Sequence, residues 1–198
     1  MAHPLILAST SAYKKMLLER LKIPFTAVAP NTTEEAKPNE TPIELASRLA
    51  KEKALAVLAL HPNAMIIGSD QVGEVKGDIL GKPHTFDNAV AQISNQSGQK
   101  VLFHSAISVV SRDNIGGIVH KSALNTTIVQ FKTLSQSQIE RYLKAEEPFD
   151  CAGSFKSEGL GISLFSSINS NDPTSLVGLP LIDLCTILES YEVKIPHI

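Results

Sequence analysis

Asp70 stands where a carboxylate is well placed to do chemistry. It lies in Gly68-Ser69-Asp70-Gln71, directly after the apolar run 64–67, which predicts a buried strand ending in Ser69-Asp70-Gln71. In open α/β sheets ligands bind outside the carboxyl ends of the strands, and a carboxylate there can bind Mg²⁺ or activate water. The alternative is a turn in which Asp70 caps its neighbours, and the segment alone leaves both open.

Ser9-Thr10-Ser11 and the two lysines after it form a candidate anion site. An apolar run at 5–8 predicts a strand and the following residues have helical spacing, so the hydroxyls lie at a strand-to-helix junction with Ser11 as N-cap. A helix N-terminus offers free N–H groups and the positive end of a dipole, which suit phosphate, and Lys14 and Lys15 add charge. On local grounds an ordinary cap followed by surface lysines is favoured.

Two further lysines stand out by their positions. Lys53 repeats with Leu45, Leu49 and Val57 on the apolar stripe of an expected helix, so it should point toward the core edge or a cleft. The alternative is a stem that lies on apolar surface while its ammonium reaches water. Lys82 sits between Gly81 and Pro83 on a stiff turn, where it can meet a phosphate, although lysines are common in turns.

Two loops carry other candidate groups. Glu34-Glu35 lies in a proline-bounded polar loop, whose usual interpretation is solvated charge. The small residues of 151–159 let the backbone approach a ligand closely, and Glu158 supplies a carboxylate there. A glycine-rich connecting loop explains the same residues. Cys151 has no evident histidine partner, so the sequence does not favour a thiol nucleophile.

Strands and helices alternate along the chain, which predicts an α/β fold with a mixed sheet. The apolar runs predict strands at 5–8, 25–29, 64–68, 101–110 and 118–131, with a hairpin at 75–79. Capping residues and apolar stripes predict helices at 12–22, 41–60, 85–94, 135–146 and 180–191.

Composition narrows the class of protein. With 198 residues, of which 43% are apolar and 19% charged, the chain can form one α/β domain or two lobes sharing a core. A net charge of -2 gives no indication of the excess positive charge that binding of duplex nucleic acid requires. Two cysteines make no disulfide framework, and neither an export signal nor a membrane span is evident, so the cytoplasm is expected and no membrane partner.

Taken together, these segments resemble the Maf family of nucleotide pyrophosphatases over nearly the whole chain, from Leu5 to about Leu188. We therefore treat residues 1–198 as a single Maf-like domain. The resemblance rests on the order and spacing of motifs, none decisive alone: the Leu-Ala-Ser-x-Ser opening, the Glu35 loop, the Lys53 helix, Ser69-Asp70-Gln71, Gly81-Lys82-Pro83, the 152–159 loop, Asp172-Pro173 and Val177-Gly178-Leu179-Pro180.

The resemblance implies a Maf/ITPase-like fold, with an elongated mixed sheet flanked by helices, a cleft between two lobes, and a possible homodimer. It also implies a nucleotide substrate attacked between its α- and β-phosphates with a divalent cation, Mg²⁺ or Mn²⁺. Asp70 is then the proton acceptor or a metal ligand, and Glu35 helps to bind the metal. The expected phosphate-binding residues are Ser9, Ser11, Lys14, Lys15, Lys53 and Lys82. Ser11 and Lys15 rank first and Lys14 last, because adjacent helical residues point different ways.

Three positions match the branch of the family associated with 7-methyl-GTP. The ring of Tyr13 can attract the positively charged 7-methylguanine, Glu158 can offset that charge, and Gln71 can both donate and accept hydrogen bonds. One departure concerns phosphate binding, because Lys14 and Lys15 stand where the family usually has arginines. A lysine keeps the positive charge but cannot make the two parallel hydrogen bonds that an arginine guanidinium makes to phosphate. The alternatives are a dTTP/UTP pyrophosphatase and a nucleotide-binding regulator of cell division with weak catalysis.

Overall fold

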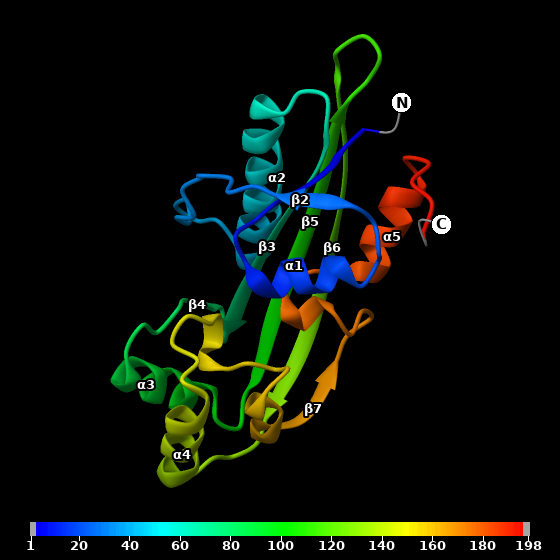
Figure 1. Ribbon diagram of the computed structural model, residues 1–198. Coiled ribbons are helices and arrows are strands. Elements are labelled where there is room, and N and C mark those ends of the chain that lie inside the picture. The colour runs from blue at the N-terminus through cyan, green and yellow to red at the C-terminus, as the bar shows by residue number, and fades with distance from the viewer. Residues whose placement is uncertain (1–2, 196–198) are drawn as a thin grey trace. The chain divides into compact units, whose positions relative to one another are not determined.

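The structure is a computed structural model that describes residues 3–195. Apart from one unpredicted strand at Phe165–Asn169, strands and α-helices follow one another as the sequence predicts (Figure 1). The strands are β1 (Leu5–Ala8), β2 (Phe25–Ala27), β3 (Met65–Val75), β4 (Asp78–Leu80), β5 (Lys100–Arg112), β6 (Ile118–Phe131) and β7 (Phe165–Asn169). The helices are α1 (Ala12–Glu19), α2 (Pro42–Leu60), α3 (Phe86–Gln96), α4 (Gln136–Glu146) and α5 (Leu181–Glu189), with short 3₁₀ turns at Ala152–Ser154, Leu160–Leu164 and Ser175–Val177.

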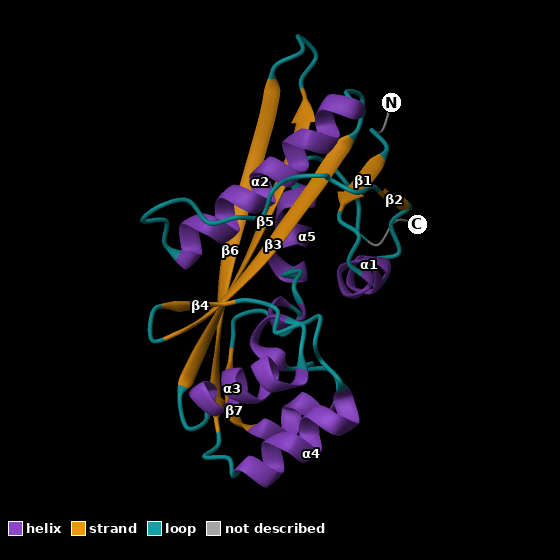
Figure 2. Ribbon diagram, turned by 90° about the vertical axis from the view of Figure 1, so that its left-hand side faces the viewer, coloured by secondary structure: helices purple, strands orange, loops and turns teal. Residues whose placement is uncertain are grey.

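The strands form one mixed sheet. Its order is β2-β1-β3-β5-β6-β7, and β4 pairs with β3. Strand β1 is parallel to both β2 and β3, whereas β3 is antiparallel to β4 and β6 to β7. Figure 2 distinguishes the strands of this sheet from the helices by colour. The predicted α/β class with a mixed, helix-flanked sheet is confirmed.

The chain divides into two compact units. Unit 1 comprises Met1–Gln71, Ser105–Asn125 and Asp172–Ile198, and unit 2 comprises Val72–His104 and Thr126–Asn171. Strands β3, β5 and β6 contribute residues to both units. That the chain works as a single domain stays a prediction.

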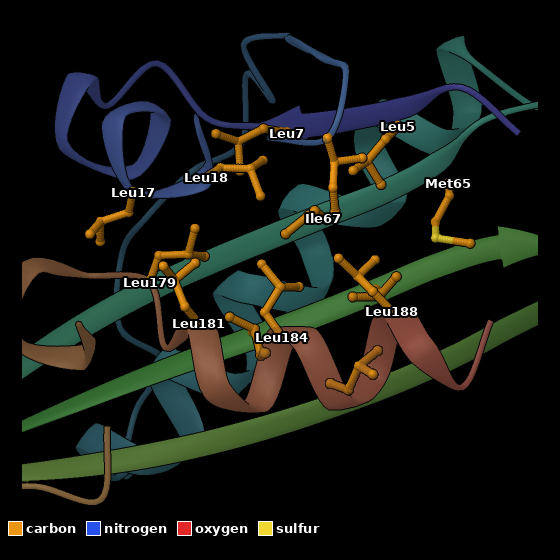
Figure 3. Close-up of a cluster of buried hydrophobic side chains, with 14 residues drawn as sticks. Leu5, Leu7, Leu17, Leu18, Met65, Ile67, Leu179, Leu181, Leu184 and Leu188 are labelled. Carbon is orange, nitrogen blue, oxygen red and sulfur yellow. The ribbon is translucent and has the colours of Figure 1, made fainter. Parts of the chain in front are cut away.

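The core of unit 1 lies on both faces of β1 and β3. Leu7 and Ile67 pack on one face with residues of α1 and α5, including Leu18 and Leu184 (Figure 3). On the other face Ile66 packs with residues of α2. Parallel strands covered on both faces read as continuous apolar runs, which is why the sequence identified β1 and the start of β3.

The first residues of α2 are fixed by predicted capping. The Thr41 hydroxyl accepts a hydrogen bond from the Glu44 amide, and the Glu44 carboxylate accepts one from the Thr41 amide. Pro42 occupies the first turn, where its missing N–H costs nothing. This capping box sets where α2 begins, and hence which residues face the sheet.

Unit 2 is built around aromatic residues. Phe155 makes edge-to-face contacts with Phe103, Phe131 and Phe165, at centroid distances of 4.9–5.7 Å. Phe165 opens β7, a strand that the sequence analysis did not predict. It pairs with β6 at the edge of the sheet, and its other residues are exposed, so it lacks an apolar pattern.

Strand β3 corrects one expectation. The prediction that the strand ends in Ser69-Asp70-Gln71 is wrong, because β3 continues through these residues to Val75. Its pairing with β1 does end there, at Ala8↔Gly68. The polar side chains are tolerated inside the strand because each has a partner: Ser69 donates to the Gly178 carbonyl, Asp70 pairs with Lys53, and Gln71 donates to Ser105.

Within residues 3–195, no helix is long and apolar enough to cross a membrane.

Candidate nucleotide site

Three charged side chains of unit 1 meet just past the end of β1. The Nζ atom of Lys53, on α2, lies 2.5 Å from Oδ1 of Asp70 on β3 and 2.5 Å from Oε1 of Glu34. Lys53 and Asp70 are buried, whereas the Glu34 side chain is 59% exposed. One ammonium therefore bridges a buried and a solvent-facing carboxylate.

The carboxylates keep Lys53 charged. Burial by itself disfavours an ammonium, but the charge and hydrogen bond of Asp70 and those of Glu34 outweigh it, so the pKa of Lys53 is raised above its usual value. The expectation that Lys53 points inward is confirmed. The alternative, in which its ammonium reaches water, is not what the structure shows.

A small pocket lies beside this cluster. Its volume is about 190 Å³. Its walls come from the end of β1, the loop after β2 and α2, and comprise Ala8, Ser9, Thr10, Ala29, Pro30, Asn31, Thr32, Glu34 and Lys53. Thr32 contributes a buried hydroxyl for which no hydrogen-bond partner is found among the described residues. The pocket thus joins hydroxyl groups, an ammonium and a carboxylate, a combination suited to a phosphorylated ligand.

The opening hydroxyl segment adopts the predicted geometry. Ser11 is the N-cap of α1 and accepts from the Lys14 amide, and the Ser9 hydroxyl accepts from the Ser11 amide at 3.1 Å. The Lys14 ammonium donates to the Ser69 carbonyl at 2.7 Å. It therefore lies against the residue that precedes Asp70.

Lys15 points elsewhere. Its exposed ammonium lies 4.0 Å from the Glu19 carboxylate, one turn further along α1. Both residues line a separate, open hollow together with Phe25 and Ala27 of β2. The two lysines diverge as helical geometry requires, but the geometry favours Lys14 over Lys15 at the Asp70 cluster, the reverse of the predicted ranking.

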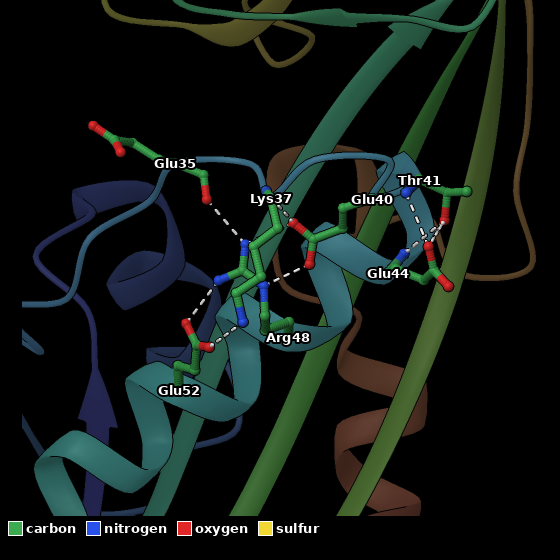
Figure 4. A network of polar contacts seen from close by, with 7 residues as sticks. All are labelled: Glu35, Lys37, Glu40, Thr41, Glu44, Arg48 and Glu52. Atoms are coloured by element: carbon green, nitrogen blue, oxygen red, sulfur yellow. Dashed lines mark hydrogen bonds and ion pairs between the residues drawn. The ribbon is translucent and has the colours of Figure 1, made fainter.

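The structure also separates the two adjacent glutamates of the loop. Glu35 meets Arg48 through its main-chain carbonyl, at 3.0 Å, and its carboxylate points away from the network drawn in Figure 4. Arg48 binds Glu40 and Glu52 instead. Glu34, rather than Glu35, faces the Lys53–Asp70 pair. The role of Glu35 as a metal ligand stays a prediction.

Gln71 has a structural task. Its Nε2 group lies 2.9 Å from the Ser105 hydroxyl, 2.9 Å from the Ser175 carbonyl and 3.0 Å from the Leu176 carbonyl. The side chain thus ties β3 to the turn before α5. Because these acceptors use the amide donor, only the oxygen of Gln71 remains as a candidate for base recognition.

The remaining predicted specificity and phosphate residues are Tyr13, Lys82 and Glu158. Tyr13 is half-buried at the second position of α1. Lys82 and Glu158 are exposed and belong to unit 2, where the Glu158 carboxylate accepts from the Ser157 hydroxyl at 3.1 Å. Burial raises the pKa of the Cys151 thiol to about 12, which keeps the thiol protonated at neutral pH.

The donor set suits a hard divalent cation. Glu34 and Asp70 present carboxylate oxygens, the ligands that Mg²⁺ and Mn²⁺ prefer. The positively charged Lys53 ammonium lies between these two carboxylates. A group of three or more histidine, cysteine or acidic residues is not found within 3–195. Mg²⁺ commonly takes one or two carboxylates and completes its shell with water and phosphate, so two carboxylates are sufficient.

The sequence analysis assigned no site role to Glu34, Thr32 or Asp172. Glu34 and Thr32 lie in a loop without periodicity, so the sequence does not show which of its side chains point toward Lys53. Asp172 was noted only as part of a motif. It is buried and accepts from the Thr174 hydroxyl and the Ile182 amide, so it fixes the beginning of α5.

Comparisons with known proteins identify the family of this chain. The 7-methyl-GTP pyrophosphatase of Xanthomonas axonopodis pv. citri (strain 306) is 52% identical over 97% of this chain and 98% of its own. That of Colwellia psychrerythraea (strain 34H) is 47% identical over 96% of this chain and 94% of its own. A Staphylococcus aureus Ham1 structure, with 13% identity and a TM-score of 0.49 over 96% of this chain and 100% of that chain, is too distant to carry an argument. The family model described as Maf-like protein matches residues 4–191, and the chain belongs to the Maf family.

Proposed function

We propose that this chain is a nucleotide pyrophosphatase that hydrolyses 7-methyl-GTP to 7-methyl-GMP and diphosphate with the help of Mg²⁺ or Mn²⁺. The observation that carries the proposal is the pair of carboxylates, Glu34 and Asp70, bridged by Lys53 at the wall of a pocket that Ser9 and Thr10 also line. Family membership and two relatives of about half-identical sequence named 7-methyl-GTP pyrophosphatase support the same activity.

The protein's own groups can divide the chemistry between them. Water attacks the α-phosphorus, the bond to the α–β bridging oxygen breaks, and diphosphate leaves with that oxygen. Asp70 accepts the proton of the attacking water. Its Oδ1 atom is on the side of Lys53 and Glu34, where the metal would bind, so Oδ2 is the oxygen assigned to take the proton. In the metal-free protein Lys53 holds the carboxylate in place, and both side chains are buried.

Phosphate oxygens need positive or hydrogen-bonding groups around them. Ser9 and Lys53 line the pocket, and Ser11 and Lys14 lie at the N-terminus of α1 next to it. We assign these four to the triphosphate. Glu34 and Asp70 would hold the divalent cation, which when bound offsets negative charge on phosphate oxygens.

The guanine base defines the substrate within this class. Tyr13 can stack its ring on the cationic 7-methylguanine, and the resemblance assigns Glu158 to the charge on the base. The proposal of 7-methyl-GTP rests on these residues and on the names of the relatives. A dTTP/UTP pyrophosphatase with the same chemistry is the alternative within enzymes.

A nucleotide panel tests the proposal. Diphosphate release is measured for 7-methyl-GTP, GTP, dTTP and UTP, with Mg²⁺, with Mn²⁺ and with a chelator. We expect the fastest metal-dependent release from 7-methyl-GTP and a smaller preference over GTP in Glu158→Gln. Faster cleavage of dTTP or UTP would contradict the substrate but not the chemistry. Nucleotide binding without diphosphate release would instead identify a regulator.

A further inference from the structure

The Lys53 ammonium occupies the position between two carboxylates that a divalent metal ion would take. Two carboxylates from different parts of unit 1, Glu34 in the loop after β2 and Asp70 on β3, each place one oxygen 2.5 Å from Nζ. The lysine itself comes from a third element, α2. All three parts of the site are therefore joined through one nitrogen atom.

In the metal-free protein the Lys53 ammonium neutralises negative charge that would otherwise be unpaired. Asp70 is 8% exposed, and a buried carboxylate needs a paired charge. A second carboxylate, Glu34, approaches the same point, and two carboxylates that share a site repel one another unless a positive charge lies between them. Lys53 supplies that charge and so holds the two metal-binding candidates together.

An ammonium and a divalent cation cannot both occupy the space between Oε1 of Glu34 and Oδ1 of Asp70. We propose that Lys53 is a resident substitute for the metal, which keeps Glu34 and Asp70 in place until a divalent cation displaces its ammonium. The proposal rests on the proposed function only in taking these two carboxylates as the metal ligands.

The adjacent pocket offers space for the displaced ammonium. Lys53 also lines the pocket of about 190 Å³, together with Ser9 and Thr10. Once released from the carboxylates, the ammonium can turn toward phosphate oxygens in that pocket. Metal and nucleotide then favour each other, because the metal frees the lysine and the phosphate receives it. In the absence of nucleotide, the metal must work against the ammonium, so its binding is weak.

Mn²⁺ binding without nucleotide tests the competition. The free Mn²⁺ concentration is followed by electron paramagnetic resonance for wild type, Lys53→Met and Lys51→Met. Lys51 is an exposed lysine on the same helix, so its variant changes net charge equally. We expect Lys53→Met to bind Mn²⁺ at least about tenfold more tightly than wild type, since the competing ammonium is gone, and Lys51→Met to match wild type.

Two further variants locate the binding. Adding Glu34→Gln or Asp70→Asn to Lys53→Met should abolish the gain. Equal or weaker Mn²⁺ binding by Lys53→Met, no binding by either protein, or a gain that persists without both carboxylates would overturn the proposal.

A measurement on wild type separates displacement from a simple charge effect and remains decisive if Lys53→Met does not fold. The protein is treated briefly with acetic anhydride, with and without saturating Mn²⁺, and the acetylation of Lys53 and Lys51 is compared by mass spectrometry. We expect Mn²⁺ to raise the labelling of Lys53 several-fold and to leave Lys51 unchanged. A Lys53 that stays protected while Mn²⁺ is bound would overturn the proposal. Neither experiment requires hydrolysis, so a failure of the proposed function is seen separately, in the nucleotide panel.

Discussion

A Cβ atom on Gly68 would lie 2.1 Å from the main-chain oxygen of Ala50, so α2 rests directly on β3 at this point. The same hypothetical atom would lie 2.8 Å from the Ala54 amide nitrogen, which leaves no flexible side chain able to move aside. Gly68 precedes Asp70 by two residues and Ala50 precedes Lys53 by three. The absence of a side chain at Gly68 therefore sets the distance between the helix that carries the ammonium and the strand that carries the carboxylate.

Gly68→Ala should damage both stability and activity. The added methyl group forces α2 away from β3, and overpacking of this kind costs about 1–3 kcal/mol or more. Turnover should fall as well, because Lys53 moves relative to Asp70. Urea unfolding and diphosphate release measure the two effects. Gly81→Ala is the control, since its Cβ would meet nothing within 4 Å. Equal stability of the two variants would contradict the role of this contact.

Glu34 and Glu35 give a direct comparison of adjacent residues. The Glu34 carboxylate contacts Lys53, whereas the Glu35 carboxylate points away from the Arg48 network. Glu34→Gln should lower turnover by roughly two orders of magnitude and weaken Mn²⁺ dependence, while Glu35→Gln has a far smaller effect. Both changes remove one charge and keep the shape. A larger loss of turnover in Glu35→Gln than in Glu34→Gln would favour Glu35 as the metal ligand, as the sequence predicts, and would contradict the assignment of Glu34.

Lys14 and Lys15 provide a second matched pair. Lys14 binds the Ser69 carbonyl beside Asp70, while Lys15 lies near Glu19 on the surface of α1. Lys14→Ala should therefore weaken triphosphate binding, measured by calorimetry with a non-hydrolysable analogue, by about tenfold or more, and Lys15→Ala by less. The nucleoside alone should bind equally to both variants. A greater loss in Lys15→Ala would favour the ranking that the sequence suggested.

The sequence predicted most of the elements because their signals are local. Thr41-Pro42 and Ser135 mark helix starts by capping, which needs only neighbouring residues, and both helices begin there. Lys53 was singled out because it shares an apolar stripe with Leu49, and its inward orientation follows from helix geometry.

The failures concern partners that lie far away in the sequence. The sequence predicts that the strand ends in Ser69-Asp70-Gln71, because it does not reveal the partners of Ser69 and Gln71. These partners, the Gly178 and Ser175 carbonyls, come from more than 100 residues further along the chain. The contact of Glu34 with Lys53 could not be predicted either, because a loop has no periodicity from which to read the orientation of its side chains. Such contacts are set by tertiary packing alone.

The contact between Glu40 and Arg48 predicts a pH dependence of stability. The hydrogen bond that the Glu40 carboxylate accepts from Arg48 lowers the pKa of Glu40 from 4.5 to about 2. A carboxyl whose pKa is lower in the folded state adds stability above pH 4.5, and this contribution disappears as the pH falls from 4.5 toward 2. Wild type should thus exceed Glu40→Gln in its free energy of unfolding at neutral pH, and the difference should shrink across this range.

Urea unfolding at a series of pH values measures that difference. In an Arg48→Met background the substitution of Glu40 should lose most of its pH dependence, because the largest cause of the lowered pKa is gone and only the contacts with Lys37 remain. A difference between wild type and Glu40→Gln that stays constant down to pH 2 would argue against the contact.

Asp70 carries the central claim, and its replacement by asparagine tests that claim most directly. Diphosphate release from 7-methyl-GTP is measured with saturating Mg²⁺ for wild type and Asp70→Asn, and circular dichroism and urea unfolding establish that the variant is folded. We predict steady release by wild type and a rate lower by roughly two or more orders of magnitude in Asp70→Asn, since the amide can neither accept the proton nor bind the metal as a carboxylate does. Near-normal turnover in the folded variant would contradict the account and remove Asp70 from the mechanism.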